Sequence, residues 1–160
     1  ERCSKSAAIV ILLEKKDQAY VKAALDAVEA YCEGSFSDAL PVMLGDRSSE
    51  LLDFAKIETG FDGRVAPDAY SDSVKPGQKG GCEKNHVELR KIPPKGTDFD
   101  AFAFDDVAKV CSHLNSYPRP NQGAAPIRLA SLVCLYLLES LGVRAVSPDD
   151  AIMTPKLLGL

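Results

Sequence analysis

The first third of the chain alternates between short apolar runs and helix-like patterns. Residues 6–15, SAAIVILLEK, form a continuous apolar run with β-branched residues, which is typical of a strand buried on both faces of a sheet. Residues 16–32 repeat their apolar positions at helical spacing until Gly34, and residues 39–45, ALPVMLG, predict a second short strand. Residues 46–60 again show the pattern of a helix. This alternation is typical of a parallel sheet with helices on its faces.

The middle of the chain interrupts this order. Residues 60–98 are dense in glycine, proline, serine and charge, and they predict a long irregular excursion. Within it, residues 86–92, HVELRKI, alternate well enough to predict an edge strand or a hairpin arm. The run GQKGG at 77–81 has the composition of a phosphate-binding loop. Because it lies between loop segments rather than between a strand and a helix, we interpret it as a solvent-exposed loop.

Regular patterns return after this excursion. Residues 99–106, FDAFAFDD, carry aromatic residues on both alternating sides and predict a central strand with two aspartates at its carboxyl end. Residues 105–114 predict a short helix, and residues 115–126 form a connector rich in proline and glycine. Residues 126–141 carry one stripe of large apolar side chains and predict a long helix, which Gly142 closes.

The end of the chain predicts one more strand and a helix. Residues 143–148, VRAVSP, predict the last strand, and Ser147 and Pro148 fit the N-cap and first position of a closing helix. The whole pattern predicts a single α/β domain over residues 1–160. Its mostly parallel sheet would be flanked by helices in a Rossmann-like or flavodoxin-like three-layer arrangement. Because the closing helix starts well and stops at a bare Leu160, the domain could be the N-terminal part of a longer protein.

The composition argues against two classes of partner. The 160 residues are 46% hydrophobic and 26% charged, as in an ordinary globular protein. The net charge of −4 argues against a nucleic-acid partner, because phosphate binding uses clustered lysine and arginine. The longest apolar-rich stretch contains Arg128 and Glu139, which favours a buried helix over a membrane span. We therefore expect neither a nucleic acid nor a membrane as partner.

The cysteines indicate the compartment. Their number is odd, their spacing is wide, and Cys32 and Cys134 lie inside apolar helical patterns. These features favour reduced thiols in the cytoplasm or another intracellular compartment. The five cysteines are Cys3, Cys32, Cys82, Cys111 and Cys134.

Two Cys–His pairs raise the question of a metal site. Cys82 with His86 and Cys111 with His113 could supply four zinc ligands, or a thiol nucleophile beside a histidine. Structural zinc sites are usually made of two tight knuckles in a domain that lacks a large core, and this chain is long enough to have one. We therefore predict no metal site.

Four polar residues are candidates for substrate binding. Asp105 and Asp106 end the predicted central strand, and ligands of parallel sheets gather at the carboxyl ends of the strands. Either aspartate could instead cap the following helix. Arg119 and Asn121 precede the predicted long helix, whose N-terminus could hold an anion with them, although a surface connector explains these two residues equally well.

The succession of FDAFAF, the helix APIRLASLVCLYLLESLGV, the strand VRAVSP and the closing DDAIMTPKLLGL resembles a known domain. It is similar to the N-terminal, pre-ATP-grasp domain of ATP-grasp ligases and kinases, a Rossmann-like layer whose last strand ends in a small polar residue. There a short helix and an Asp-Lys pair lead into the ATP-binding domain. Ser147 and Pro148 match the strand end and Lys156 matches the lysine, while Pro155 stands where the family has aspartate.

This resemblance implies a function. The chain would be the substrate-side N-terminal domain of an ATP-dependent ligase or kinase and would not be catalytically complete alone. The complete protein would use ATP and Mg, with no cofactor in this chain alone, and Lys156 would reach the nucleotide phosphates. Asp105 and the loop at Arg119 would lie near a small-molecule acceptor substrate. A missing C-terminal ATP-binding domain or a protein partner would complete the enzyme.

Two other classes of function stay open. The chain could be a stand-alone α/β binding or protein-interaction module within a larger assembly, with residues 60–98 as its contact segment. It could also be a small Rossmann-like transferase or hydrolase that uses Asp105 and Asp106.

Overall fold

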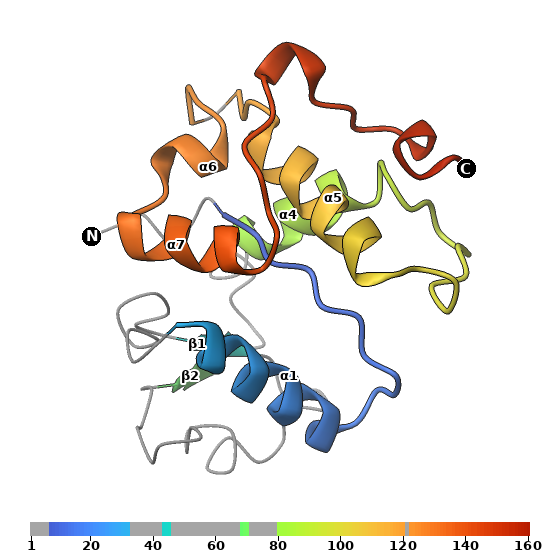
Figure 1. The fold of residues 1–160 in the computed structure, drawn as a ribbon, viewed down its shortest axis with the longest axis vertical. Helices are drawn as coiled ribbons and strands as arrows, with labels where there is room; N and C mark the ends of the chain where they lie inside the picture. The colour runs from blue at the N-terminus through green and yellow to red at the C-terminus, as the bar shows by residue number, and fades with distance from the viewer. Residues whose placement is uncertain (1–6, 33–42, 46–67, 71–79, 121) are drawn as a thin grey trace. The chain divides into compact units, whose positions relative to one another are not determined.

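The computed structural model of the chain divides it into two compact units (Figure 1). One unit comprises residues 1–12 and 80–160, and the other comprises residues 13–79. The residues that the structure describes are 7–32, 43–45, 68–70, 80–120 and 122–160.

The unit of residues 13–79 contains helix α1 (Gln18–Tyr31). Its N-cap is Asp17, whose Oδ1 accepts a hydrogen bond from the Ala19 N–H at 2.8 Å, and this bond satisfies one of the unpaired donors at the helix start. One turn further on, Lys22 and Asp26 form an i,i+4 ion pair with 2.8 Å between Nζ and Oδ2. The helix predicted for this part of the chain is confirmed.

Among its described residues, the same unit contains a short parallel strand pair. Strand β1 (Met43–Gly45) lies beside β2 (Asp68–Tyr70), with Met43 opposite Asp68. β1 lies inside the strand predicted over residues 39–45. The helix predicted over residues 46–60 lies outside the described residues.

The other unit is helical. Helix α5 packs against α4 and α6, and a further helix and two short 3-10 turns follow. The elements are α4 (Gly80–Leu89), α5 (Phe104–Ser116), α6 (Pro126–Leu129), α7 (Leu132–Ser140), η4 (Pro148–Asp150) and η5 (Pro155–Leu158). The short helix predicted over residues 105–114 is confirmed by α5.

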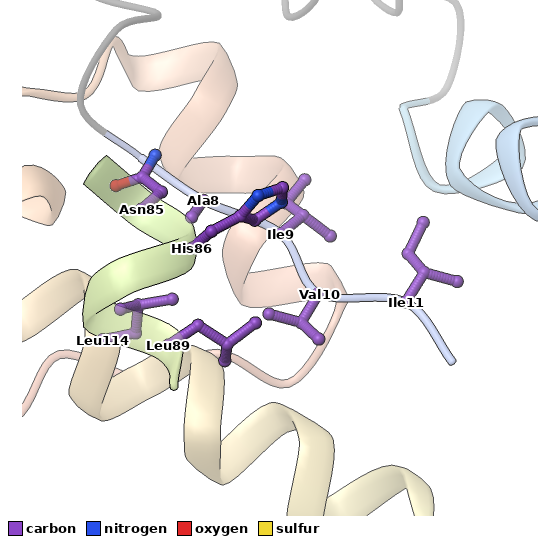
Figure 2. Close-up of a pocket in the computed structure, with 8 residues that line it drawn as sticks. All are labelled: Ala8, Ile9, Val10, Ile11, Asn85, His86, Leu89 and Leu114. Atoms are coloured by element: carbon purple, nitrogen blue, oxygen red, sulfur yellow. The ribbon is translucent and has the colours of Figure 1, made fainter. Parts of the chain in front are cut away.

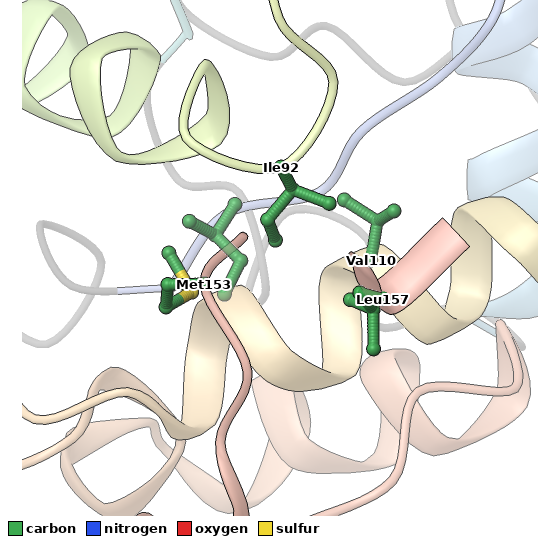
Figure 3. Packing of buried hydrophobic residues seen from close by; sticks show 5 residues of the cluster. Ile92, Val110, Met153 and Leu157 are labelled. Carbon is green, nitrogen blue, oxygen red and sulfur yellow. The ribbon is translucent and has the colours of Figure 1, made fainter. Parts of the chain in front are cut away.

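Two apolar clusters form the core of this unit, and α5 contributes to both. Val110 and Leu114 belong to the first cluster, while Cys111 belongs to the second. Burying each large apolar side chain stabilises the fold by roughly 1.5–3 kcal/mol. The first cluster consists of Ile92, Val110, Leu114, Met153 and Leu157 (Figure 3). The second consists of Cys111, Leu138 and Val143.

The N-terminal segment (residues 7–12) lies against α5 rather than in a sheet. Asn115 of α5 accepts the Ala8 N–H at its Oδ1 and donates from its Nδ2 to the Ala8 carbonyl, both at 2.7 Å. The Val10 N–H donates to the Cys111 Sγ at 3.3 Å. These side chains satisfy backbone groups that a neighbouring strand would otherwise satisfy.

The C-terminal segment (residues 143–146) is held by α5 in the same way. The Arg144 N–H donates to the Ser112 Oγ and the Val146 N–H donates to the Ser116 Oγ, both at 2.9 Å. Buried polar side chains on α5 thus serve two extended segments as hydrogen-bond partners.

These contacts explain why the predicted α/β fold is wrong. An apolar extended run usually finds its backbone partners in adjacent strands, and that rule led to the predicted parallel sheet. In the described residues the sheet is limited to the three-residue pair β1–β2, and helices form most of the regular structure. The protein therefore lacks the Rossmann-like three-layer arrangement there.

Two further strand predictions fail for local reasons. In the predicted strand over 99–106, the Phe102 N–H donates to the Phe99 carbonyl at 3.1 Å, which makes a turn, and α5 begins at Phe104. The predicted edge strand over 86–92 is mostly the second half of α4, so the irregular excursion predicted over 60–98 is also wrong for residues 80–89.

The long helix predicted over residues 126–141 is interrupted. α6 ends at Leu129, and Ser131 starts α7 by accepting the Cys134 N–H at its Oγ, with 3.2 Å between N and Oγ. The predicted end of this helical region is confirmed, because Gly142 has φ of 76°, a conformation that favours glycine. The closing helix is replaced by η4 and η5.

A search of the described helices for membrane-spanning candidates finds none with the length and apolarity that a bilayer crossing requires.

Candidate functional site

Helix α4 carries polar and apolar groups on two adjoining faces. The first is the wall of a pocket of about 400 Å³ between α4, α5 and the N-terminal segment (Figure 2). Because its lining is mostly apolar and its polar side chains are only those of Asn85 and His86, the pocket suits an apolar group better than a phosphate. The lining residues are Ala8, Ile9, Val10, Ile11, Asn85, His86, Leu89 and Leu114.

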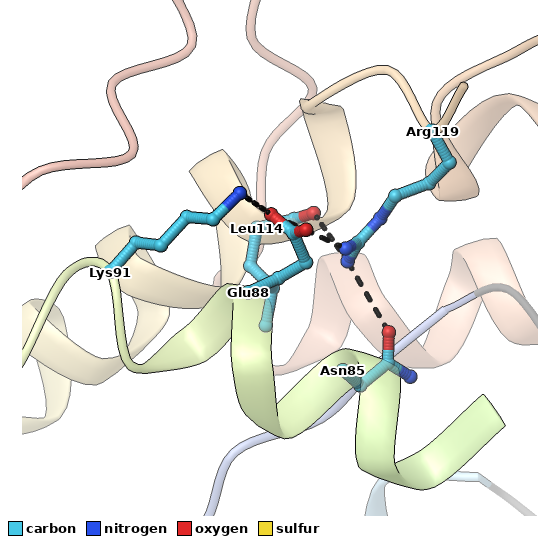
Figure 4. A network of polar contacts seen from close by, with 5 residues as sticks. All are labelled: Asn85, Glu88, Lys91, Leu114 and Arg119. Atoms are coloured by element: carbon cyan, nitrogen blue, oxygen red, sulfur yellow. Dashed lines mark hydrogen bonds and ion pairs between the residues drawn. The ribbon is translucent and has the colours of Figure 1, made fainter. Parts of the chain in front are cut away.

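The second face of α4 holds a buried arginine from the connector after α5 (Figure 4). The Arg119 Nη2 donates to the Asn85 Oδ1 at 3.3 Å and to the Leu114 carbonyl at 3.4 Å. The Arg119 Nη1 lies 3.7 Å from the Glu88 Oε2 and makes no hydrogen bond in the described part of the protein. Arg119 therefore ties the connector to both α4 and α5.

The carboxylate of Glu88 is shared between two cations. Its Oε2 accepts a hydrogen bond from the Lys91 Nζ at 2.6 Å and also faces Arg119. Lys91 additionally lies over the ring of Tyr117, with 5.6 Å between Nζ and the ring centroid. Burial lowers the pKa of Arg119, and the charges of Glu88 and Tyr117 oppose that shift. Since arginine stays protonated at any ordinary pH, the single carboxylate of Glu88 faces two positive charges, those of Lys91 and Arg119.

The chain that leaves α4 presents three basic side chains to solvent. Arg90 and Lys95 are exposed, and the side chain of Lys91 keeps 44% of its surface accessible. Between them, Ile92 is fully buried in the first apolar cluster, which anchors the backbone of this stretch. We call residues 90–95 the basic segment.

The two candidate aspartates lie in the first turn of α5. Asp105 is exposed, while the Oδ2 of Asp106 accepts the Ala103 N–H at 3.0 Å. The capping interpretation is therefore confirmed for Asp106, and negative charge there also suits the positive end of the helix dipole. Neither residue stands at the end of a strand.

The other candidates are dispersed. Arg119 is buried against α4, Lys156 is exposed on η5, and Asn121 lies outside the described residues. Among the described candidates, no hydrogen bond or ion pair joins Arg119 or Lys156 to the aspartates. A substrate-binding role for these residues stays a prediction.

The histidine and cysteine of α5 have structural partners. The Cys111 thiol accepts the Val10 N–H, and its burial raises its pKa, which keeps it protonated. The His113 Nδ1 accepts the Ile152 N–H at 3.0 Å. The described residues contain no cluster of three or more histidine, cysteine or acidic side chains that could hold a metal ion.

His113 should make stability depend on pH. Burial, and secondarily the charge of Lys109, lowers its pKa below the ordinary value of about 6.5. The unfolded chain then binds more protons than the folded chain as the pH falls below 6.5, so this contribution to stability is complete above 6.5 and is lost on acidification. Urea unfolding at pH 7.5 and pH 5.5 measures it. We expect wild type to lose more stability over this interval than His113→Gln, and equal losses would refute the assignment.

Comparison with known proteins gives one informative similarity. Neither a protein family nor a solved structure matches the chain. A DNA transposition protein does: the transposase for insertion sequence element IS1086 of Cupriavidus metallidurans is 26% identical over 109 residues. The match covers 68% of this chain and 31% of the transposase, so the chain spans about a third of the length of that relative.

This similarity overturns the functional interpretation of the sequence. The resemblance to ATP-grasp domains, and the ATP-dependent ligase or kinase inferred from it, are wrong, because the similarity found is to a transposase and no ATP-grasp family matches. The alternative of an α/β interaction module is wrong as well, because the predicted α/β fold is absent from the described residues. The expectation of no nucleic-acid partner conflicts with the similarity as well.

Sequence reasoning missed the polar face of α4. Asn85 and Glu88 on α4, and Lys91 just after its end, recur at intervals of three residues, which is the spacing of one helix face. The signal was present, but it becomes visible only when residues 80–89 are treated as a helix instead of a loop and an edge strand.

Proposed function

We propose that this chain has a DNA-related function and works as part of a larger, transposase-like protein. The observation that carries the proposal is the 26% identity to a transposase over 68% of the chain. Because the chain spans 31% of that relative, the proposal extends to the role of one part and not to a complete activity.

One physical feature supports a DNA-related function, and the net charge of the chain does not exclude it. The net charge of −4 is a property of the whole chain, whereas a DNA backbone responds to charge within about one Debye length, or roughly 10 Å. Locally, the basic segment offers exposed cations at Arg90, Lys91 and Lys95.

Binding of duplex DNA tests the proposal. A fluorescently labelled duplex of random sequence is titrated with the purified chain at several salt concentrations and followed by anisotropy, with a mononucleotide at equal phosphate concentration as the control competitor. We expect binding that weakens as salt rises, with an affinity in the range of about 10⁻⁴–10⁻⁶ M that is typical of sequence-independent contacts. Absence of binding even at low salt, or equal competition by the mononucleotide, would contradict a DNA-related function for this chain.

A further inference from the structure

We propose that the basic segment is the surface by which this unit contacts the DNA phosphate backbone, with Arg90 and Lys95 as its principal contacts. This inference rests on the proposed DNA-related function and adds the location of the interface. The position of each cation in the structure supports it.

Arg90 and Lys95 are available for an external partner. Both are exposed, and neither side chain makes a hydrogen bond or ion pair in the described part of the chain. Lys91 is partly engaged, because it is bonded to Glu88 and lies over Tyr117, yet nearly half of its side chain is accessible. The segment therefore has two uncommitted cations and a third, partly engaged one that are accessible to phosphates.

The local charge is positive even though the chain is acidic overall. Two cations face Glu88, Lys91 and the buried Arg119, and Arg90 and Lys95 follow Glu88 within seven residues of the chain. Since Glu88 is the single carboxylate that faces Lys91 and Arg119 among the described residues, it compensates only part of this charge.

Glu88 precedes the basic segment by two residues, and two aspartates follow the segment. Asp98 and Asp100 are both exposed, and the Oδ1 of Asp98 accepts the Asp100 N–H at 3.0 Å. Asp98 is thus committed to a local turn.

The helix dipole alone does not account for these cations. Basic residues are favourable near the negative C-terminal end of a helix, and this explains Arg90 and Lys91, which follow Leu89 at the end of α4. The effect fades within one turn, and Lys95 lies beyond it, after two prolines. The helix dipole therefore does not account for Lys95.

The backbone between these cations is fixed. Ile92 is fully buried among Val110, Leu114, Met153 and Leu157. Pro93 is buried as well, and the Thr97 Oγ1 donates to the Pro94 carbonyl at 2.8 Å. Arg119 holds the preceding helix through Asn85 and Glu88. The cations are thus presented from an anchored backbone.

The length of the segment fits a nucleic-acid strand. Five residue steps separate residues 90 and 95, so their Cα atoms lie at most about 18 Å apart. Phosphates of one DNA strand are spaced about 3.4 Å along the helix axis, so Arg90 and Lys95 can contact different phosphates of one strand.

The test compares two double variants that remove the same charge. Arg90→Gln with Lys95→Gln alters the proposed contacts, and Arg128→Gln with Arg144→Gln removes two exposed cations from other parts of the unit. Each is titrated against the same labelled duplex as wild type, over a series of salt concentrations. Circular dichroism and thermal unfolding establish that both variants fold as wild type does.

The salt dependence distinguishes the outcomes. Each lost phosphate contact lowers the slope of log affinity against log salt by about 0.9, so the first variant should lose up to about 1.8 of slope and about tenfold in affinity. The control variant should keep the wild-type slope. Equal loss in both variants would overturn the proposed interface while leaving the DNA-related function in place. If wild type does not bind DNA at all, the proposed function itself fails.

Discussion

Asn115→Leu should lower the free energy of unfolding by about 2–4 kcal/mol, since it removes several buried hydrogen bonds and leaves backbone groups without partners. Asn115 is fully buried, and its amide bonds the N–H and carbonyl of Ala8 and the carbonyl of Cys111. Leucine has a similarly branched side chain with the same number of heavy atoms, but it can form none of these bonds. Chemical denaturation of the two proteins gives the difference directly.

A matched control separates this effect from the general cost of replacing an amide by leucine. Gln122 carries an exposed amide in the connector after α5, and Gln122→Leu should change stability by less than about 0.5 kcal/mol. Hydrogen exchange adds a local measure, because amides of the N-terminal segment should exchange faster in Asn115→Leu. If the two substitutions cost the same, the N-terminal segment is not held by α5.

Leu114→Ala should be equally severe, with a loss of about 2–5 kcal/mol, because it opens a cavity in the first apolar cluster. Leu114 is 1% exposed and packs with Ile92, Val110 and Met153. It also forms part of the pocket wall, so the void would join an existing hollow.

The same chemical change on the surface serves as its control. Leu132 is 84% exposed at the start of α7, and Leu132→Ala should cost less than about 0.5 kcal/mol. Urea unfolding of the two variants gives the comparison. A cost for Leu114→Ala near that of Leu132→Ala would mean that α5 does not form the core of this unit.

Sequence patterns predicted helices where local signals were complete. α1 has a capping aspartate, alanine-rich turns and apolar positions at helical spacing, and α5 has acidic residues in its first turn. Both were predicted close to their observed bounds, because such signals lie within a few residues of the element they define.

Strand predictions failed because a strand is defined by its partner. The apolar run over residues 6–15 was predicted to be a strand buried on both faces of a sheet, and this is wrong. The backbone N–H groups of Ala8 and Val10 instead bond to Asn115 and Cys111 of a helix about a hundred residues away. Likewise, the segment after Gly142 bonds to Ser112 and Ser116. No local pattern distinguishes a strand in a sheet from an extended chain on a helix.

The candidate site was predictable only in part. Arg119 was selected from its connector as a possible anion-binding residue, yet the structure buries it against Glu88 and Asn85. The contacts of Arg119 with Asn85 and Glu88 could not be predicted, because the alternating pattern of HVELRKI predicted a strand instead of a helix. The net charge of −4 argued against a nucleic-acid partner, but it averages over the whole chain and conceals the run of Arg90, Lys91 and Lys95.

The most direct test of the central claim is a lysine footprint of the chain with and without bound duplex DNA. Exposed lysines are acetylated briefly, and mass spectrometry gives the rate at each position. If the basic segment contacts DNA, Lys91 and Lys95 should be acetylated more slowly in the complex than in the free chain. The acetylation rate of Lys156 on η5 should stay unchanged. Unchanged rates at Lys91 and Lys95 under saturating DNA, or equal protection of Lys156, would contradict it.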